Sequence, residues 1–214
     1  MSGVTHSPAE IFEAALALGR ALVHCEKYAL VGGSACVVLG SIRATQDADF
    51  VVLRGRLSNA RRLLRASSDF VVEARTNHTT FKAERQVQVD ILAPPVWFQE
   101  PFDETTEVTT IEGIKVLKPA LLLNAKCRSI LSRPTAQKRR TDHHDIIFLL
   151  NFCVKNPGYL PKATEVPNAR EELVQLILQI YGGQKDWVRA GYNFENGFVL
   201  SSSREGMTLL IRIN

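Results

Sequence analysis

The sequence predicts a mixed α/β (α+β) protein: a small mixed β-sheet core flanked by helices in residues 1–113, followed by a mostly helical half in residues 114–214. Two observations predict this organisation. Before Gly113, short apolar strand-like segments alternate with segments of helical spacing, whereas from Pro119 onwards helical segments follow one another across short polar loops. With 214 residues, 45% of them hydrophobic, the chain can bury a substantial core as one large domain or two small ones.

The first element has clear boundary signals. Ser7, Pro8 and Glu10 are an N-cap, a first-turn proline and a capping-box glutamate in the right order, and apolar residues then recur at helical spacing. They predict a helix over residues 7–25. The apolar run at 28–31 predicts a short strand.

A turn and a second helix follow this strand. Gly32 and Gly33 break the strand, and residues 34–40 read as a short helix that ends at Gly40. Residues 48–53 are apolar on both faces, which predicts a central strand whose end emerges at a cleft.

The remaining elements are predicted from periodicity and breakers. In the first half these are a basic amphipathic helix over 56–68 and short strands at 70–75, 79–83 and 87–93. Residues 106–119 look irregular or weakly extended. The second half carries predicted helices at 120–131, 141–154 and 168–182, and a terminal hairpin with a turn at Asn196-Gly197.

Composition narrows the class of protein. The formal charge of +4 and the pI near 9.0 mildly favour an anionic partner. No apolar run approaches the ~20 residues of a membrane span, and no secretory signal pattern opens the chain, so we expect a cytoplasmic protein with no membrane partner. The four cysteines are far apart without a C-x-x-C pair, which predicts buried, reduced thiols.

The chemistry is concentrated at two aspartates. Alternate residues of a strand point the same way, so Asp47 and Asp49 present both carboxylates to one side, and Ala48 and Phe50 point to the other. Two like charges held this close repel, and a divalent cation such as Mg²⁺ removes the conflict. The pair therefore predicts a metal site.

Neighbouring residues complete the predicted site. Gly33 permits close backbone approach, and Ser34, at the start of the next helix, offers a hydroxyl and free N–H groups to a phosphate. Arg43 is a candidate phosphate clamp. Asp90 is a third carboxylate in an apolar strand, and it converges on the cation if its strand lies beside that of Asp47 and Asp49.

These motifs resemble the nucleotidyltransferase superfamily, which includes DNA polymerase beta, the tRNA-tailing enzymes and the antibiotic nucleotidyltransferases. The likeness is close over residues 28–53 and 86–92: glycine-glycine-serine, a dozen residues, aspartate-x-aspartate, then an isolated carboxylate in an apolar strand. Residues 116–150 resemble the second half of minimal members, especially the AbiEii/MenT-like toxins and the lincosamide-type enzymes. The resemblance implies a nucleotidyltransferase core in residues 1–113.

The resemblance also implies residue roles and a reaction. Lys126 would touch the phosphates of a nucleoside triphosphate (NTP), such as ATP, and Asp145 would orient the nucleotide or assist activation of the acceptor. An acceptor hydroxyl would attack the α-phosphorus in line and expel pyrophosphate. Mg²⁺ or Mn²⁺ is the implied cofactor: one ion held by Asp47, Asp49 and Asp90 would lower the pKa of the hydroxyl, and another held by Asp47 and Asp49 would bind the triphosphate. Asp90 would accept the proton.

Several alternatives stay open at this point. The acceptor is a tRNA or other RNA 3′ end, which basic clusters at 61–65 and 137–141 favour slightly, or a small hydroxylated molecule such as an antibiotic. A partner protein, such as an antitoxin, is unknown. The alternative function is a non-catalytic nucleotide-binding or regulatory module, although three aspartates that repel one another argue against a site without its cation.

Plainer interpretations exist for single residues. Asp90 suits a solvent-facing position on a half-exposed strand. Lys126 suits a solvent-exposed position on a helix. The run Asp142–Asp145 does not predict a metal site, because adjacent histidines on a helix point in different directions, and Thr141-Asp142 suits a helix N-cap.

Overall fold

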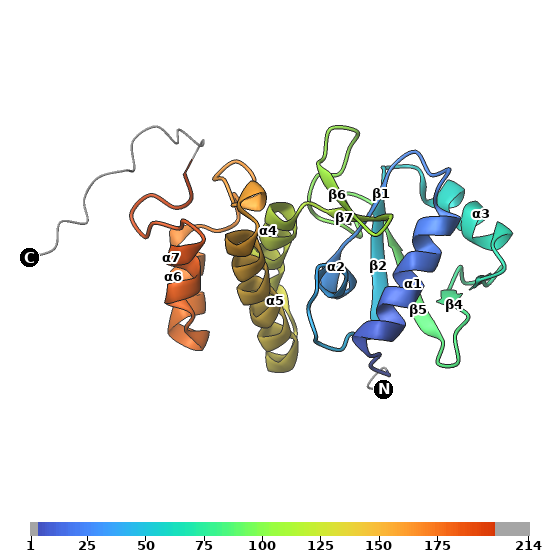
Figure 1. The fold of residues 1–214 in the computed structure, drawn as a ribbon, viewed down its shortest axis with the longest axis horizontal. Helices are drawn as coiled ribbons and strands as arrows, with labels where there is room; N and C mark the ends of the chain where they lie inside the picture. The colour runs from blue at the N-terminus through green and yellow to red at the C-terminus, as the bar shows by residue number, and fades with distance from the viewer. Residues whose placement is uncertain (1–3, 200–214) are drawn as a thin grey trace, which may run out of the picture.

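The chain folds into a seven-stranded mixed sheet with helices around it, which confirms the predicted fold class (Figure 1). The computed structural model describes residues 4–199. The strands are β1 (Tyr28–Leu30), β2 (Asp47–Val52), β3 (Phe70–Val72), β4 (Thr79–Phe81), β5 (Val87–Leu92), β6 (Val108–Ile111) and β7 (Ile114–Leu117). The α-helices are α1 (Pro8–Ala21), α2 (Gly32–Val38), α3 (Leu57–Ala66), α4 (Pro119–Ser129), α5 (Ala136–Lys155), α6 (Glu171–Tyr181) and α7 (Gln184–Arg189).

The strand that begins with the two aspartates lies at the centre of the sheet. The strand order is β3-β4-β5-β2-β1-β7-β6, with β2 antiparallel to β1 and parallel to β5. Phe50, Val51 and Val52 are fully buried, as a strand covered on both faces requires. This confirms the predicted central strand at residues 48–53.

Helix α1 covers one face of this sheet and begins as predicted. The backbone N–H of Ser7 donates to the Glu10 carboxylate (2.8 Å), and the Glu10 N–H donates to Ser7 Oγ (3.3 Å), so the capping box is complete. The helix packs against β2, β5 and β7 with a fully buried apolar stripe that includes Ile11 and Leu18 (Figure 1).

Residues 106–119, which were predicted to be irregular or weakly extended, form a regular hairpin. Strands β6 and β7 pair antiparallel, with Val108 opposite Leu117 at one end and Ile111 opposite Ile114 at the other. Glu112 and Gly113 make the turn, both with positive φ (49° and 82°). Strand β7 runs parallel to β1, so the sheet extends past Gly113; the division into domains there stays a prediction.

The helical half packs around α5. Helices α4, α6 and α7 each contact α5, and α2 reaches it from the sheet side (Figure 1). Helix α5 begins earlier than predicted: Thr135 is its N-cap and accepts from the Lys138 N–H (3.2 Å). The N-cap predicted at Thr141-Asp142 is therefore wrong, and the basic cluster at 137–141 lies in the helix rather than in a loop.

The last described segment holds one element that the sequence did not predict. Helix α7 follows α6 directly and buries Trp187 completely. The turn at Asn196-Gly197 is present, bridged by backbone hydrogen bonds between Asn193 and Gly197, and the rest of the predicted hairpin lies outside the described residues.

Two compositional expectations have structural counterparts. The four cysteines are free and buried, as predicted: Cys25, Cys36, Cys127 and Cys153. None of the helices within residues 4–199 combines the length and the apolar character that crossing a membrane requires.

Candidate active site

Three carboxylates from two adjacent strands meet at one point on the sheet. Strands β2 and β5 are parallel, with Asp49 directly opposite Asp90. Oxygens of Asp47, Asp49 and Asp90 lie within 4.8 Å of one another, while Ala48 is fully buried on the other face. The predicted convergence of the three aspartates is therefore present, and among the described residues they are the one group of acidic, histidine or cysteine side chains close enough to share a metal ion.

The environment of Asp47 and Asp49 disfavours their charged forms. Burial, followed by the charges of Asp47 and Asp90, raises the pKa of Asp49 to about 8. Burial and the charge of Asp90 also raise the pKa of Asp47 above its ordinary value. Without a counter-charge, the site therefore keeps a proton near neutral pH, and a divalent cation would replace it.

Ser34 is placed differently from the prediction. Its side chain is fully buried, and its hydroxyl donates to the Val31 carbonyl (3.0 Å) while accepting from the Asp49 N–H (3.1 Å). The hydroxyl thus ties helix α2 to strand β2 beneath the carboxylates. Because the hydroxyl is fully buried and its one O–H donates inside the fold, it is not presented to a phosphate.

The two glycines before Ser34 are required by close neighbours. Gly32 has φ of +63°, and a Cβ there would collide with the Asp49 carboxylate. At Gly33 a Cβ would collide with the guanidinium of Arg43 and lie 2.8 Å from Thr45 Oγ1. The pair therefore makes room for a carboxylate on one side and a cation on the other.

Arg43 and Lys126 are held by one buried acid. Arg43 pairs with Asp145 in a bidentate manner, with Nε–Oδ1 and Nη2–Oδ2 distances of 2.5 and 2.7 Å. Lys126 Nζ lies 2.7 Å from the same Asp145 carboxylate, which is fully buried. Although burial would lower the pKa of Lys126, the charges of Asp145 and Asp142 raise it, so the ammonium stays charged. Asp145 thus positions two cations, and its own oxygens are occupied.

Asp142 and Arg133 extend this cluster, and sequence reasoning missed both as site residues. The Asp142 carboxylate accepts from Lys126 Nζ (2.8 Å), Ser129 Oγ (2.9 Å) and Arg133 Nε (2.5 Å). Burial would raise the pKa of Asp142, but the Arg133 hydrogen bond and the Lys126 charge hold it below its usual value. The available signal was spacing: Asp142 and Asp145, three residues apart on one helix, share a face.

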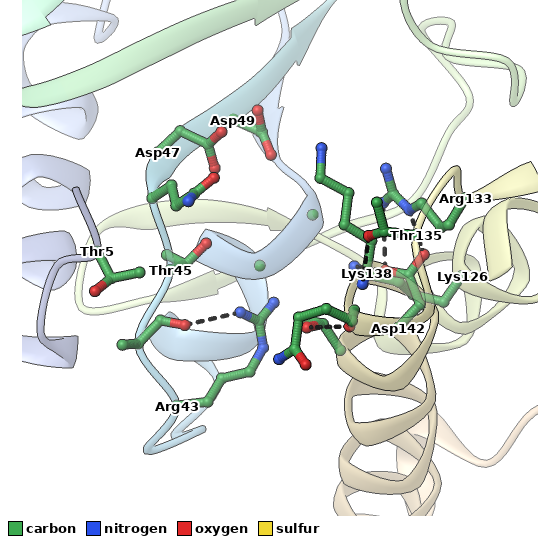
Figure 2. Close-up of a pocket in the computed structure, with 16 residues that line it drawn as sticks. Thr5, Arg43, Thr45, Asp47, Asp49, Lys126, Arg133, Thr135, Lys138 and Asp142 are labelled. Atoms are coloured by element: carbon green, nitrogen blue, oxygen red, sulfur yellow. Dashed lines mark hydrogen bonds and ion pairs between the residues drawn. The ribbon is translucent and has the colours of Figure 1, made fainter. Parts of the chain in front are cut away.

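A cleft of about 450 Å³, here named the Asp47 cleft, opens between β2 and α5. Figure 2 shows Asp47 and Asp49 on one side of it and Lys126, Arg133 and Asp142 on the other. Of the predicted site residues, Gly33, Arg43, Asp47, Asp49 and Lys126 line the Asp47 cleft. Ser34, Asp90 and Asp145 do not line it.

The charges in and around the Asp47 cleft are segregated. Strand β2 carries the carboxylates, and the helical side carries Lys126 and Arg133, paired with Asp142. Arg43, from the loop before β2, adds a third cation paired with buried Asp145. Exposed Lys138, at the first turn of α5, adds a fourth cation. A cation-binding acidic cluster opposite a surplus of guanidinium and ammonium groups suits a metal-chelated polyphosphate.

Comparison with known structures places the fold in a class. An antigenic nucleotidyltransferase-like protein from Paracoccidioides brasiliensis matches with a TM-score of 0.67 and 22% identity over 93% of this chain and 98% of that one. JHP933 from Helicobacter pylori matches with a TM-score of 0.50 and 14% identity over 86% and 76% of the two chains. The chain therefore has a nucleotidyltransferase-like fold.

The comparisons go no further than the fold. No protein-family model matches the chain, and no curated protein does. The narrower likeness to AbiEii/MenT-like or lincosamide-type enzymes stays a prediction from the sequence, and activity has to be argued from the site itself.

Proposed function

We propose that this protein is a nucleotidyltransferase that depends on a divalent cation and moves a nucleoside monophosphate from an NTP to an acceptor hydroxyl. The observation that carries this proposal is the convergence of Asp47, Asp49 and Asp90 from parallel strands, opposite the cations of the Asp47 cleft. The nucleotidyltransferase-like fold of the chain supports the same reading.

The donor set fits Mg²⁺ or Mn²⁺. Carboxylate oxygens are the ligands that hard divalent cations prefer. Burial, followed by the charges of neighbouring aspartates, raises the pKa values of Asp47 and Asp49, and a bound cation would offset both effects. Asp47, Asp49 and Asp90 would hold the cation, which when bound would neutralise phosphate charge and acidify the acceptor hydroxyl.

The cations of the Asp47 cleft bind and orient the triphosphate. Lys126 and Arg133 are fixed by Asp142, and Arg43 is fixed by Asp145, so their donors need little reorganisation when phosphate arrives. In the proposed step the acceptor oxygen bonds to the α-phosphorus while the bond to the bridging oxygen breaks, and pyrophosphate leaves with the electron pair. The hydroxyl proton passes to Asp90, whose carboxylate is oriented by Gln88 Nε2 (2.9 Å).

The proposed acceptor is an RNA 3′ end, with tRNA as the first candidate, and a small hydroxylated molecule is second. The net charge of +4 and the cations at the mouth of the Asp47 cleft support a polyanionic acceptor. The cytoplasm, where NTPs and RNA are both present, is the proposed location.

The test is label transfer. Purified protein is incubated with Mg²⁺, each α-labelled NTP in turn and total tRNA, beside the Asp47→Asn/Asp49→Asn variant. This variant removes repelling charges, so we expect it to remain folded, which its melting temperature checks. Label on RNA only with the intact aspartates supports the proposal. NTP binding without transfer to RNA, small hydroxylated molecules or protein would instead support a non-catalytic nucleotide-binding module.

A further inference from the structure

A second cavity adjoins the Asp47 cleft at Asp49. It has a volume of about 380 Å³, and it shares Gly32, Asp49, Lys126 and Arg133 with the Asp47 cleft. Its remaining walls come from the segment after β5 and from α4. We name it the Trp97 cavity. A molecule in either space therefore reaches the same aspartate.

Trp97 is the unusual feature of this cavity. Its side chain is 69% exposed and that of its neighbour Val96 is 71% exposed, while Phe98 is buried and anchors the segment. Leu92 and Leu122 add apolar surface to the cavity walls. Trp97 thus exposes a large aromatic surface in the cavity that Asp49 also lines. Flat π-faces of this kind stack on nucleobases.

The rim of the Trp97 cavity is cationic. Arg128 and Arg133 both line it, and their side chains are 49% and 37% exposed. Glu100 approaches Arg128 at 3.7 Å, but Asn124 Nδ2 and Asn168 Nδ2 also donate to the Glu100 carboxylate, at 2.7 and 3.0 Å. An aromatic platform with guanidinium groups beside it matches a base joined to phosphates rather than an uncharged alcohol.

We infer that the Trp97 cavity holds the 3′-terminal nucleotide of a single-stranded RNA acceptor, with its base stacked on Trp97 and its backbone phosphate at Arg128. This rests on the proposed function, which puts the leaving pyrophosphate against the cations of the Asp47 cleft. In-line displacement needs the attacking oxygen on the opposite side of the α-phosphorus. We place the acceptor in the Trp97 cavity because the Asp47 cleft is assigned to the triphosphate and the two spaces meet at Asp49.

The chain provides its own optical probe. It has two tryptophans, and the other, Trp187, is fully buried against Tyr192 and Phe198. A single-stranded RNA octamer with a free 3′ hydroxyl, added without NTP, is expected to quench tryptophan emission saturably. The same titration with Trp97→Phe, in which only buried Trp187 emits, should show no saturable loss. Equal quenching of both proteins would overturn the inference.

The titration also separates the RNA acceptor from its competitors. A blunt RNA duplex, whose bases are stacked already, is expected to quench weakly. Quenching by a non-hydrolysable NTP analogue with Mg²⁺, but not by the octamer, would overturn the assignment, because the Trp97 cavity would then hold the donor base. No quenching by either ligand would also overturn it.

Kinetics give the second readout. Trp97→Ala is expected to raise the KM for the octamer about 5- to 150-fold, the usual range for losing one base–aromatic stack, while the KM for NTP changes less than twofold. Trp97→Phe should recover most of the loss, and Ile42→Ala, at a 92% exposed apolar residue outside both cavities, should have no effect. Quenching without transfer would leave RNA binding at Trp97 but remove the proposed function, and with it the role of the RNA as acceptor. Transfer without quenching would leave the proposed function and overturn the inference.

Discussion

Arg43 and Asp145, 102 positions apart in the sequence, form a bidentate ion pair that joins the loop before β2 to the middle of α5. Arg43 lines the Asp47 cleft and Asp145 is buried behind it. The pair therefore couples the carboxylate-bearing sheet to the helical half, and it fixes one cation of the site through a fully buried side chain.

Removing the acid of this pair should destabilise the protein. Asp145→Asn leaves Arg43 and Lys126 without their shared counter-charge, and breaking a buried pair typically costs about 3 kcal/mol or more. For a chain of this size we expect the melting temperature to fall by roughly 6–12 °C. Asp69→Asn, which breaks the exposed Arg20–Asp69 pair (3.4 Å), is the matched control and should cost less than ~1 kcal/mol. Equal losses in the two variants would contradict the structural role of Asp145.

The acidic cluster predicts a particular pH dependence without metal. Because the pKa of Asp49 is about 8 in the folded protein and ~4 in an unfolded chain, the folded state holds an extra proton between these values. Stability contributed by that proton is complete below about pH 4 and is lost as the pH rises to about 8. We expect Mg²⁺ in excess of EDTA to raise the melting temperature more at pH 8 than at pH 5.5.

The variant Asp49→Asn tests the origin of this effect. It removes the titrating group, so both the loss of stability toward pH 8 and the gain from Mg²⁺ should shrink. Differential scanning fluorimetry at the two pH values, with and without Mg²⁺, measures both. A Mg²⁺ gain that is the same at both pH values would count against a cation at Asp49.

Gly33→Ala should weaken nucleotide binding by displacing a cation. The added Cβ would occupy the space of the Arg43 guanidinium, so Arg43 must leave its alignment with Asp145. We expect the KM for NTP to rise about tenfold, the loss of one charge-assisted contact. Gly158→Ala, where a Cβ meets nothing within 4 Å, is the control and should leave the KM unchanged. Equal KM values for the two variants would show that Arg43 does not hold the nucleotide.

Ser34→Ala separates a structural hydroxyl from a phosphate ligand. The buried Oγ bridges Val31 and the Asp49 backbone, so its loss should cost about 1–3 kcal/mol in urea unfolding. The KM for NTP should change less than twofold. Exposed Ser58→Ala controls for removal of a hydroxyl. A large rise in KM with unchanged stability would restore the phosphate contact that the sequence suggested.

The predictions from sequence were most accurate where the structure of a short segment depends only on its own residues. The capping box of α1 and the alternation of Asp47, Ala48 and Asp49 were predicted correctly, because N-cap geometry and strand periodicity involve only neighbouring residues. The hairpin at 106–119 was missed because strand propensity depends on the surface available for pairing. Here the edge of β1 supplies that surface to β7.

The sequence by itself determined the fold class, the acidic pair on one face of a strand, and the chemistry that such a pair favours. Only the tertiary structure decided that Asp90 lies opposite Asp49, that Ser34 is turned inward, and that Asp145 and Asp142 hold the cations of the Asp47 cleft. The physical reason is the distance along the chain over which each interaction acts. Periodicity and capping act over a few residues, whereas strand order and the pairing of buried charges depend on which distant segments the packed core brings together.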